Sequence, residues 1–436
     1  MNTNNEELKK QKTMFEKNKQ RYLDRSRIVA SKYLQKLEEL PGAPEELRYF
    51  TDILRKVFIN NEVVTYEDNE KFVGSFCSML PPELVEAAGA RPLRLCSNNL
   101  AGFNVGEFVT PTCVCPLVKS VVGSVAGEIG EIYKACDMYV VPATCDCKRN
   151  LASQLTEYKT TIPLYVPINR EDNEGINLYI HELKKLVEKI SEITGVRVSR
   201  EKLLEKILLY ADVQKEIRNF INFKGENNIL IRGTHAMAVM NSLAYDDITS
   251  WGKHLKKLNT ELLDRKNNQK YITKRNLPRI LIAGSPITFP NVKVPLIVEE
   301  RGGIVVADET CMGDRNAYDM LSICGNSLDG YYRAIANRII RPCSCSVFSN
   351  LEPRIHKLEK MLKSSKAEGI IYHVYRGCIV NDYEFENIKS HFANLDIPVI
   401  RVESDCSEED IEQLGVRIEA FVEMIKFQKQ KKGEIQ

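Results

Sequence analysis

Short apolar runs alternate with amphipathic stretches along most of this chain. Residues 137–147 contain one such run, which stops at a pair of cysteines, Cys145 and Cys147. A run of this length between turn residues predicts a strand buried on both faces of a parallel sheet. Residues 367–378 repeat the arrangement and end at Cys378. Because sites in open α/β sheets lie at the carboxyl ends of the strands, both runs place thiols where a site is expected.

The N-terminal part predicts helices. Residues 1 to about 40 are rich in Lys, Arg, Glu and Leu with an irregular helical period, and the segment 41–44 (Pro-Gly-Ala-Pro) ends them. We expect one long surface helix that lies on its own domain, although it could also contact a partner. A second helix is expected at about 45–60, and together these residues form an N-terminal helical extension, 1–60.

The rest of the chain predicts two α/β lobes joined by a helical region. The first lobe, 61–175, has strands ending at Cys96, Cys145 and Pro167 and helices opened by Pro81 or Pro82 and by Pro116. Residues 176–277 show helical periodicity and no cysteine. The second lobe, 278–436, alternates strands with helices at about 352–365 and 407–427, which implies a parallel sheet. The predicted fold class is therefore α/β, with two Rossmann-like lobes.

Composition narrows the classes of function. A net charge of +2 over 436 residues gives no large field of one sign, which argues against nucleic acid or a membrane as the partner. The polar first residues lack the apolar core of a signal peptide, so we expect a cytoplasmic protein. Thirteen cysteines in that compartment stay reduced, and metal ligation or plain burial explains them better than disulfides.

The cysteines divide into two sets. Any one of them can be a small apolar side chain buried in the core, and this interpretation is preferred for Cys77, Cys96, Cys136, Cys324 and Cys406. A functional role is preferred for three others at strand ends or helix starts, which are Cys115, Cys145 and Cys378. Zinc knuckles of the C-x2-C type do not occur in the sequence, and dispersed thiolates suit an iron-sulfur cluster better, although a zinc-stabilised scaffold stays open.

Other candidate groups are less informative. Lys119, Lys148 and Arg149 could offset the charge of a cluster or could be ordinary surface cations. His373 lies inside a predicted strand and is expected to be a packed core residue. The sequence has no G-x-x-x-x-G-K-[ST] loop and no dinucleotide fingerprint, which argues against ATP hydrolysis or ordinary NAD binding.

Seven stretches together resemble the 2-hydroxyacyl-CoA dehydratase and benzoyl-CoA reductase family. They are 76–90, 115–120, 144–146, 278–284, 308–315, 343–345 and 400–405. The resemblance implies a [4Fe-4S] cluster at the junction of the lobes, held by Cys115, Cys145 and Cys378. It also implies an ATP-dependent activase as electron donor, a homodimer or a heterodimer with a sister subunit, and an acyl-CoA substrate. In this chemistry one electron turns the thioester carbonyl into a ketyl radical anion, the α-hydroxyl leaves, and the electron returns.

The sequence also departs from the usual dehydratase pattern. Cys147 stands where a glycine is usual, and further thiols could hold a second cubane, namely Cys77, Cys113, Cys147, Cys311, Cys343 and Cys345. This is similar to the double-cubane cluster proteins, a homodimeric branch of the same family that resembles reductases of small molecules and carries an [8Fe-9S] cluster. A non-catalytic iron-sulfur electron-transfer protein is a further alternative. Glu83 and Ser78, beside Cys77, are candidate catalytic groups, and Glu83 could instead only complement a helix dipole.

Overall fold

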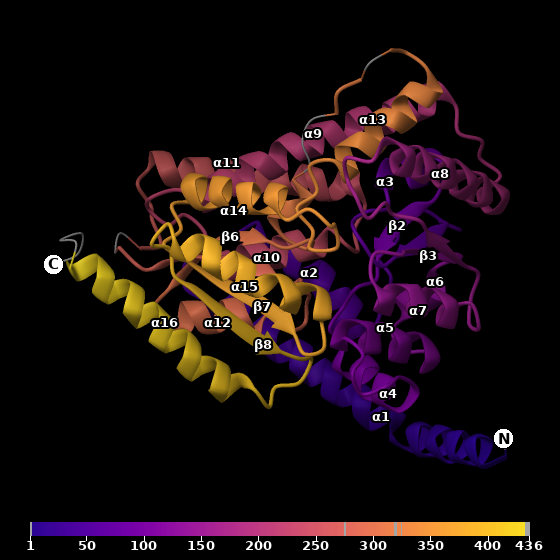
Figure 1. Cartoon of the computed structure of the whole chain (residues 1–436), viewed down its shortest axis with the longest axis horizontal. Coiled ribbons are helices and arrows are strands. Elements are labelled where there is room, and N and C mark those ends of the chain that lie inside the picture. The colour runs from indigo at the N-terminus through magenta and orange to yellow at the C-terminus, as the bar shows by residue number, and fades with distance from the viewer. Residues whose placement is uncertain (1, 274–275, 318–320, 324, 432–436) are drawn as a thin grey trace.

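The computed structural model describes residues 2–273, 276–317, 321–323 and 325–431, and residues 2–17 by their backbone alone. Two four-stranded parallel sheets form separate lobes, and long helices cross between them (Figure 1). This confirms the predicted α/β class, the two parallel sheets and the N-terminal helical extension. No helix in these described ranges has the length and apolarity needed to cross a lipid bilayer.

The N-terminal helices pack against both halves of the molecule. Helix α1 (Asn2–Glu39) is followed by α2 (Leu47–Arg55), which continues into a π-helical turn, η1 (Lys56–Asn60). Tyr33, Leu34 and Leu37 of α1 are buried. Lys32 pairs with Glu408 at 2.7 Å near the other end of the chain. The prediction that this helix lies on its own protein is thus confirmed from the described side chains.

The first sheet has the strand order β2-β1-β3-β4. Its central strand β3 (Met138–Pro142) is buried at every position, as the apolar run predicted. The remaining elements of this lobe are β1 (Phe72–Ser75), α3 (Pro82–Ala87), β2 (Arg91–Arg94), α4 (Leu100–Val109), α5 (Pro116–Ala126), α6 (Glu131–Ala135), α7 (Asp146–Leu155) and β4 (Thr161–Leu164).

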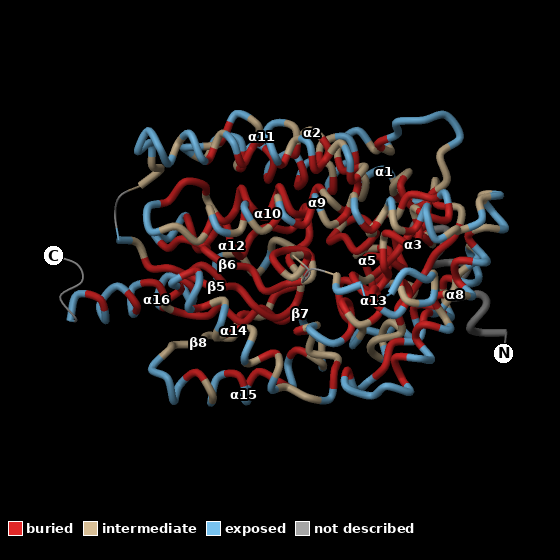
Figure 2. Tube along the Cα trace, turned by 90° about the horizontal axis from the view of Figure 1, so that it is seen from above, coloured by how far each residue is buried: buried red, intermediate tan, exposed pale blue. Residues whose placement is uncertain are grey.

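Four helices connect the lobes, and two of them run along the top of the molecule in Figure 1. They are α8 (Asn173–Thr194), α9 (Arg200–Lys224), α10 (Gly233–Ser242) and α11 (Ile248–Asn267). Trp251 of α11 is fully buried and donates its indole N–H to Ser242 at 2.9 Å. These helices therefore contribute to the core rather than forming a loose linker (Figure 2).

The second sheet has the order β6-β5-β7-β8, which repeats the connectivity of the first sheet. Strands β5 (Arg279–Gly284), β6 (Ile304–Glu309) and β7 (Gly369–Tyr375) are buried throughout, whereas the edge strand β8 (Val399–Ser404) is half-exposed. The other elements are α12 (Lys293–Glu300), a 3-10 turn η2 (Asp314–Asn316), α13 (Leu328–Ile340), α14 (Glu352–Ser365), α15 (Ile379–Ala393) and α16 (Ile411–Lys431). In each sheet the strand order reverses beside the first strand, and this is where open α/β folds place their ligands.

Candidate functional site

Three helices begin directly after a cysteine. Cys115 is the N-cap of α5, Cys145 the N-cap of α7 and Cys378 the N-cap of α15. Pro116 opens α5, since its missing N–H is not needed in the first turn. The free amides and dipole of a helix N-terminus favour a thiolate at each of these positions, whereas burial of the side chain opposes it.

The Cys115 thiol pairs with Cys378, and Cys145 lies near enough to Cys378 for their charges to interact, so we call these three thiols the three-thiol site. A hydrogen bond from the Cys115 thiol lowers the pKa of Cys378 to about 6, and the same bond raises the pKa of Cys115. The Asn381 amide also donates to Cys378 Sγ at 3.2 Å. Burial raises the pKa of Cys145, and the nearby charge of Cys378 raises it further. Thiols from both lobes therefore converge, and chemistry that needs several thiolates in one place becomes possible.

A glycine allows this convergence. Gly377, between β7 and Cys378, has a φ of +77°, in the left-handed region that favours glycine. A Cβ atom on Gly377 would lie 2.7 Å from the carbonyl oxygen of Cys113 in the first lobe. The two lobes thus meet backbone to backbone beside the paired thiols, and a side chain at this position would separate them.

The three candidate counter-cations occupy different environments. Lys119 is buried, pairs with Glu107 and donates to the Thr112 carbonyl at 2.9 Å, so it fixes the loop before Cys113. Arg149 is 58% exposed and lies 3.6 Å from Asp146, as a surface cation would.

Lys148 is different, because it lies between two sets of thiols. It is half-buried and donates to the Phe76 carbonyl. Burial would lower its pKa, but the charges of surrounding thiols, including Cys77 and Cys145, raise it above the ordinary value. It is therefore placed to offset negative charge on both sides.

The second set, which we call the second thiol group, consists of Cys77, Cys311, Cys343 and Cys345. Burial raises the pKa of both Cys311 and Cys343 to about 12. The thiol of Cys77 is also buried, but Lys148, the Met79 N–H and nearby Arg94 lower its pKa below the ordinary value. Burial would likewise lower the pKa of Arg315, but Glu309 and three of these thiols raise it. This group therefore has its own guanidinium counter-charge.

A buried ion-pair network fixes the loop that carries Cys343 and Cys345. Ser344, between these cysteines, donates to Glu309 Oε1 at 2.6 Å, and its own carbonyl accepts from Arg354. The Glu309 carboxylate also pairs with Arg315 at 2.8 Å and with Arg354 at 3.0 Å. Because charges this deeply buried are stable only when paired, the network holds the loop in one conformation.

The two candidate catalytic groups lie beside the second thiol group. Ser78 lines a small cavity of about 30 Å³ together with Cys343, Arg315 and Arg338. Glu83 is 1% exposed, and its carboxylate lies 2.6 Å from the Arg338 guanidinium. Glu83 is therefore held in a buried ion pair, and its role in chemistry stays a prediction.

The remaining cysteines and His373 are mostly structural. Three thiols are buried and donate to oxygen atoms, namely Cys96 to Phe76, Cys136 to Ile132 and Cys406 to Asn98, which confirms their predicted burial. Cys113 is exposed and Cys147 is partly buried, whereas Cys324 lies outside the described residues. His373 is 2% exposed, contacts Ser285 and Ser404, and has its pKa lowered by burial to about 4, which confirms a core role.

Within the described ranges, no three His, Cys, Asp or Glu side chains converge as a single metal ion would require. The thiolates of a cubane bind separate irons, so a cubane does not require such convergence. The residues that could hold a cluster are therefore the three-thiol site and the second thiol group.

Sequence reasoning missed the partners of the buried charges. Asp308 and Glu309 end a buried strand whose other residues are apolar, and an ionised Glu309 there requires a cation. The sequence alone could therefore have predicted a cation beside Glu309, but long-range packing decides that the cations are Arg315 and Arg354. Glu86, whose pKa burial raises to about 7, gave no signal beyond its place in a helix pattern.

Comparison with known proteins finds relatives among dehydratase and reductase subunits. The family model described as 2-hydroxyglutaryl-CoA dehydratase, D-component, matches residues 77–425. The chain is 27% identical to YjiM of Escherichia coli (strain K12), over 81% of this chain and 91% of that protein. It is 23% identical to the (R)-phenyllactyl-CoA dehydratase beta subunit of Clostridium sporogenes, covering 82% and 93%. It is 21% identical to a benzoyl-CoA reductase subunit of Thauera aromatica, covering 70% and 78%.

Proposed function

Because the chain belongs to the family of the 2-hydroxyglutaryl-CoA dehydratase D-component, and is thus an enzyme subunit of the dehydratase or reductase type, we propose that it is the iron-sulfur component of a 2-hydroxyacyl-CoA dehydratase-type enzyme. The observation that carries the proposal is the hydrogen bond between the Cys115 and Cys378 thiols, with Cys145 near Cys378 and all three at helix N-termini.

These residues fit a [4Fe-4S] cluster. The contact between Cys115 and Cys378 favours loss of one proton, and the three helix N-termini favour the negative charge that cluster ligands carry. Three ligands on a four-iron cluster leave one iron without a protein thiolate. Such a cluster supplies a low-potential electron and, at the open iron, a Lewis acid.

The protein's own residues would do the rest. Lys148 offsets negative charge beside Cys145, and the Gly377 turn keeps Cys378 against the first lobe. In the proposed reaction an electron enters the acyl-CoA thioester carbonyl and the α-hydroxyl leaves as water. The neighbouring carbon loses a proton, and the electron returns, so no net oxidation occurs. Ser78 and Glu83 are the proposed proton-handling groups.

Partners follow from the same proposal. The relatives from C. sporogenes and T. aromatica are named as subunits, which supports a partner subunit here, either a second copy or a sister chain. An ATP-dependent activase would supply the electron, since the sequence has no phosphate-binding loop of its own.

Iron and sulfide analysis after anaerobic purification tests the proposal. We expect about four of each per chain for one cubane. Replacing any one of Cys115, Cys145 and Cys378 by Ser should remove most of this iron. Cys136→Ser, which changes a buried structural thiol, should retain it. An iron-free wild-type protein would refute the proposal.

The second thiol group favours one further candidate, a homodimeric double-cubane reductase of small molecules. Its four thiols lie with Arg315 and Lys148 in a buried, cation-compensated setting, as a second cluster would require. This candidate predicts about eight irons per chain. Cys311→Ser or Cys343→Ser would then remove about half of the iron, whereas a single cubane predicts no change.

A further inference from the structure

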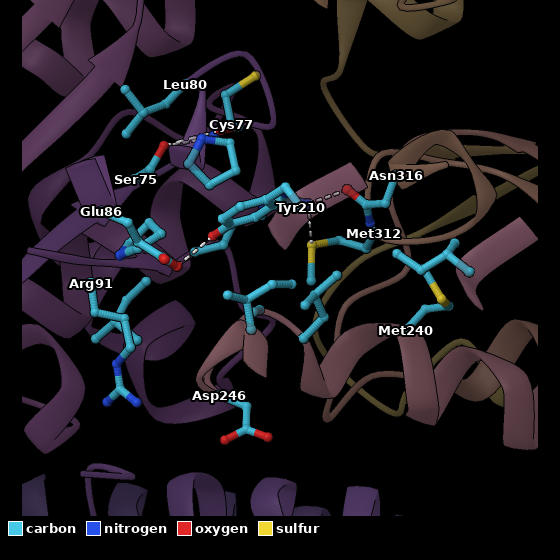
Figure 3. Close-up of a pocket in the computed structure, with 18 of the residues that line it drawn as sticks. Ser75, Cys77, Leu80, Glu86, Arg91, Tyr210, Met240, Asp246, Met312 and Asn316 are labelled. Atoms are coloured by element: carbon cyan, nitrogen blue, oxygen red, sulfur yellow. Dashed lines mark hydrogen bonds between the residues drawn. The ribbon is translucent and has the colours of Figure 1, made fainter. Parts of the chain in front are cut away.

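A cavity lies between the first lobe and the connecting helices, away from the three-thiol site. It has a volume of about 80 Å³, and β2, α3, α9 and α10 contribute to its walls. None of Cys115, Cys145 and Cys378 lines it. Figure 3 shows Tyr210 across its middle, with the hydroxyl turned toward Glu86 and with Met240 and Met312 on the opposite side.

One face of α9 lines this cavity. Tyr210, Gln214 and Ile217 are spaced four and three residues apart, so they lie on the same side of the helix. The Tyr210 hydroxyl donates to Glu86 Oε1 at 2.7 Å. Gln214 is 7% exposed and donates its amide N–H to the Asn316 carbonyl at 2.9 Å.

The other end of the Gln214 amide is unsatisfied. Its Oε1 atom meets no hydrogen-bond donor among the described residues, although it is buried at the cavity wall. Arg91, 5% exposed, likewise has its Nη1 without an acceptor among them. A buried polar atom without a partner destabilises the fold, so such atoms normally face water or a ligand.

The lining indicates what kind of ligand fits. Its ionisable side chains already have partners in the protein: Glu86 accepts from Tyr210, Asp246 accepts from Tyr49, Arg91 pairs with Glu70, and Arg94 donates to the Cys311 carbonyl. None of the four therefore needs an ion as its partner. Most of the remaining wall is apolar. One water needs about 10–15 Å³ of such space, so the cavity has room for roughly five to eight non-hydrogen atoms.

We propose that this cavity binds a small neutral molecule, with a hydrogen-bond donor for Gln214 Oε1 and an apolar body against Ile217, Met240 and Met312. The site is distinct from the three-thiol site and does not depend on a cluster there. It lies next to the second thiol group, because Cys77 lines the cavity and Arg94 reaches from it to the Cys311 carbonyl at 2.7 Å.

Fluorine NMR on the anaerobically purified protein tests this proposal, with 2,2,2-trifluoroacetamide as the probe. The probe has seven non-hydrogen atoms, an amide donor and an apolar end. We expect saturable binding in the millimolar range or tighter. 2,2,2-Trifluoroethyl methyl ether also has seven non-hydrogen atoms but no donor, and it should bind at least about tenfold more weakly, because Gln214 then stays unpaired. Trifluoroacetate, an anion, should also bind more weakly.

Three variants locate the site. Ile217→Trp fills the cavity and should abolish binding. Gln214→Leu removes the acceptor, and the affinities of the amide and the ether should become nearly equal. Leu208→Gln changes a 56% exposed residue of the same helix and should leave binding unchanged. Thermal unfolding checks that each variant is folded.

The results that overturn the proposal are equally specific. Absence of saturable binding to the wild-type protein would mean that the cavity holds only water. Binding that persists in folded Ile217→Trp would place the probe elsewhere. Equal wild-type affinity for the amide and the ether would remove Gln214 from the site.

Discussion

The carboxyl group of Glu86 makes stability depend on pH in a way that can be calculated. Its side chain is 11% exposed, and burial raises its pKa from 4.5 to about 7, although Tyr210 and Lys206 act in the opposite direction. The folded protein therefore holds this proton at pH values where the unfolded chain has lost it. By linkage, the free energy of unfolding decreases as the pH rises from about 4.5 to 7 and then levels off.

Glu86→Gln removes this dependence, because glutamine does not titrate. Each pKa unit corresponds to about 1.36 kcal/mol, so the ionised carboxylate destabilises the fold by about 3 kcal/mol, most of which develops between pH 5 and pH 8. With an unfolding entropy of about 2.1 cal/mol/K per residue over 436 residues, this corresponds to about 3 °C. The melting temperature of Glu86→Gln, relative to wild type, should therefore rise by about that amount between the two pH values.

Differential scanning calorimetry at pH 5 and pH 8 measures this difference. Glu205→Gln is the matched control, since Glu205 is also 3.7 Å from Lys206 but is 71% exposed. Tyr210→Phe removes a hydrogen bond that lowers the pKa of Glu86, so it should move the transition to higher pH. A difference between Glu86→Gln and wild type that is constant or falls with pH would refute the reasoning.

Three further substitutions test the site. Glu83→Gln removes the carboxylate that pairs with the buried Arg338 and should lower the free energy of unfolding by about 3–5 kcal/mol, measured by urea denaturation. Reduced turnover with unchanged stability would instead support a role for Glu83 as a base. Glu309→Gln should loosen the Cys343–Cys345 loop, seen as faster proteolysis there, and an unchanged rate would count against the ion-pair network as its anchor. Gly377→Ala should reduce iron per chain, whereas Gly302→Ala, also at positive φ but in open space, should not; equal iron in both would contradict the lobe contact.

The sequence predicted the elements best where burial alone decides them. Strands β3 and β7 are buried at every residue, so their apolar runs identified them, and helix α14 was predicted with nearly its observed bounds. The predicted ends of helices were less accurate where a residue distant in the sequence binds the segment at the helix end. The last helix was expected from residue 407 but begins at Ile411, because the buried Lys293 binds Asp410 and the Ser407 carbonyl.

In the candidate site, too, the features set by local sequence were predicted and those set by long-range packing were not. The sequence placed Cys115 before a helix opened by Pro116 and Cys145 and Cys378 at strand ends, because that geometry is local, and the structure shows a helix beginning after each of them. The pairing of Glu83 with Arg338 depends on residues 255 positions apart, and no local pattern encodes it. A charged residue inside an apolar element indicates that an oppositely charged partner exists, but only the packed structure identifies that partner.

The contact between the lobes at Gly377 also has an entropic consequence. Any group bound by both Cys115 and Cys378 would close a covalent loop of about 260 residues, and a cross-link of that length restricts the unfolded chain by roughly 5 kcal/mol. Resistance to denaturant should then fall on chelation or exposure to air, even though every hydrogen bond in the protein could still form.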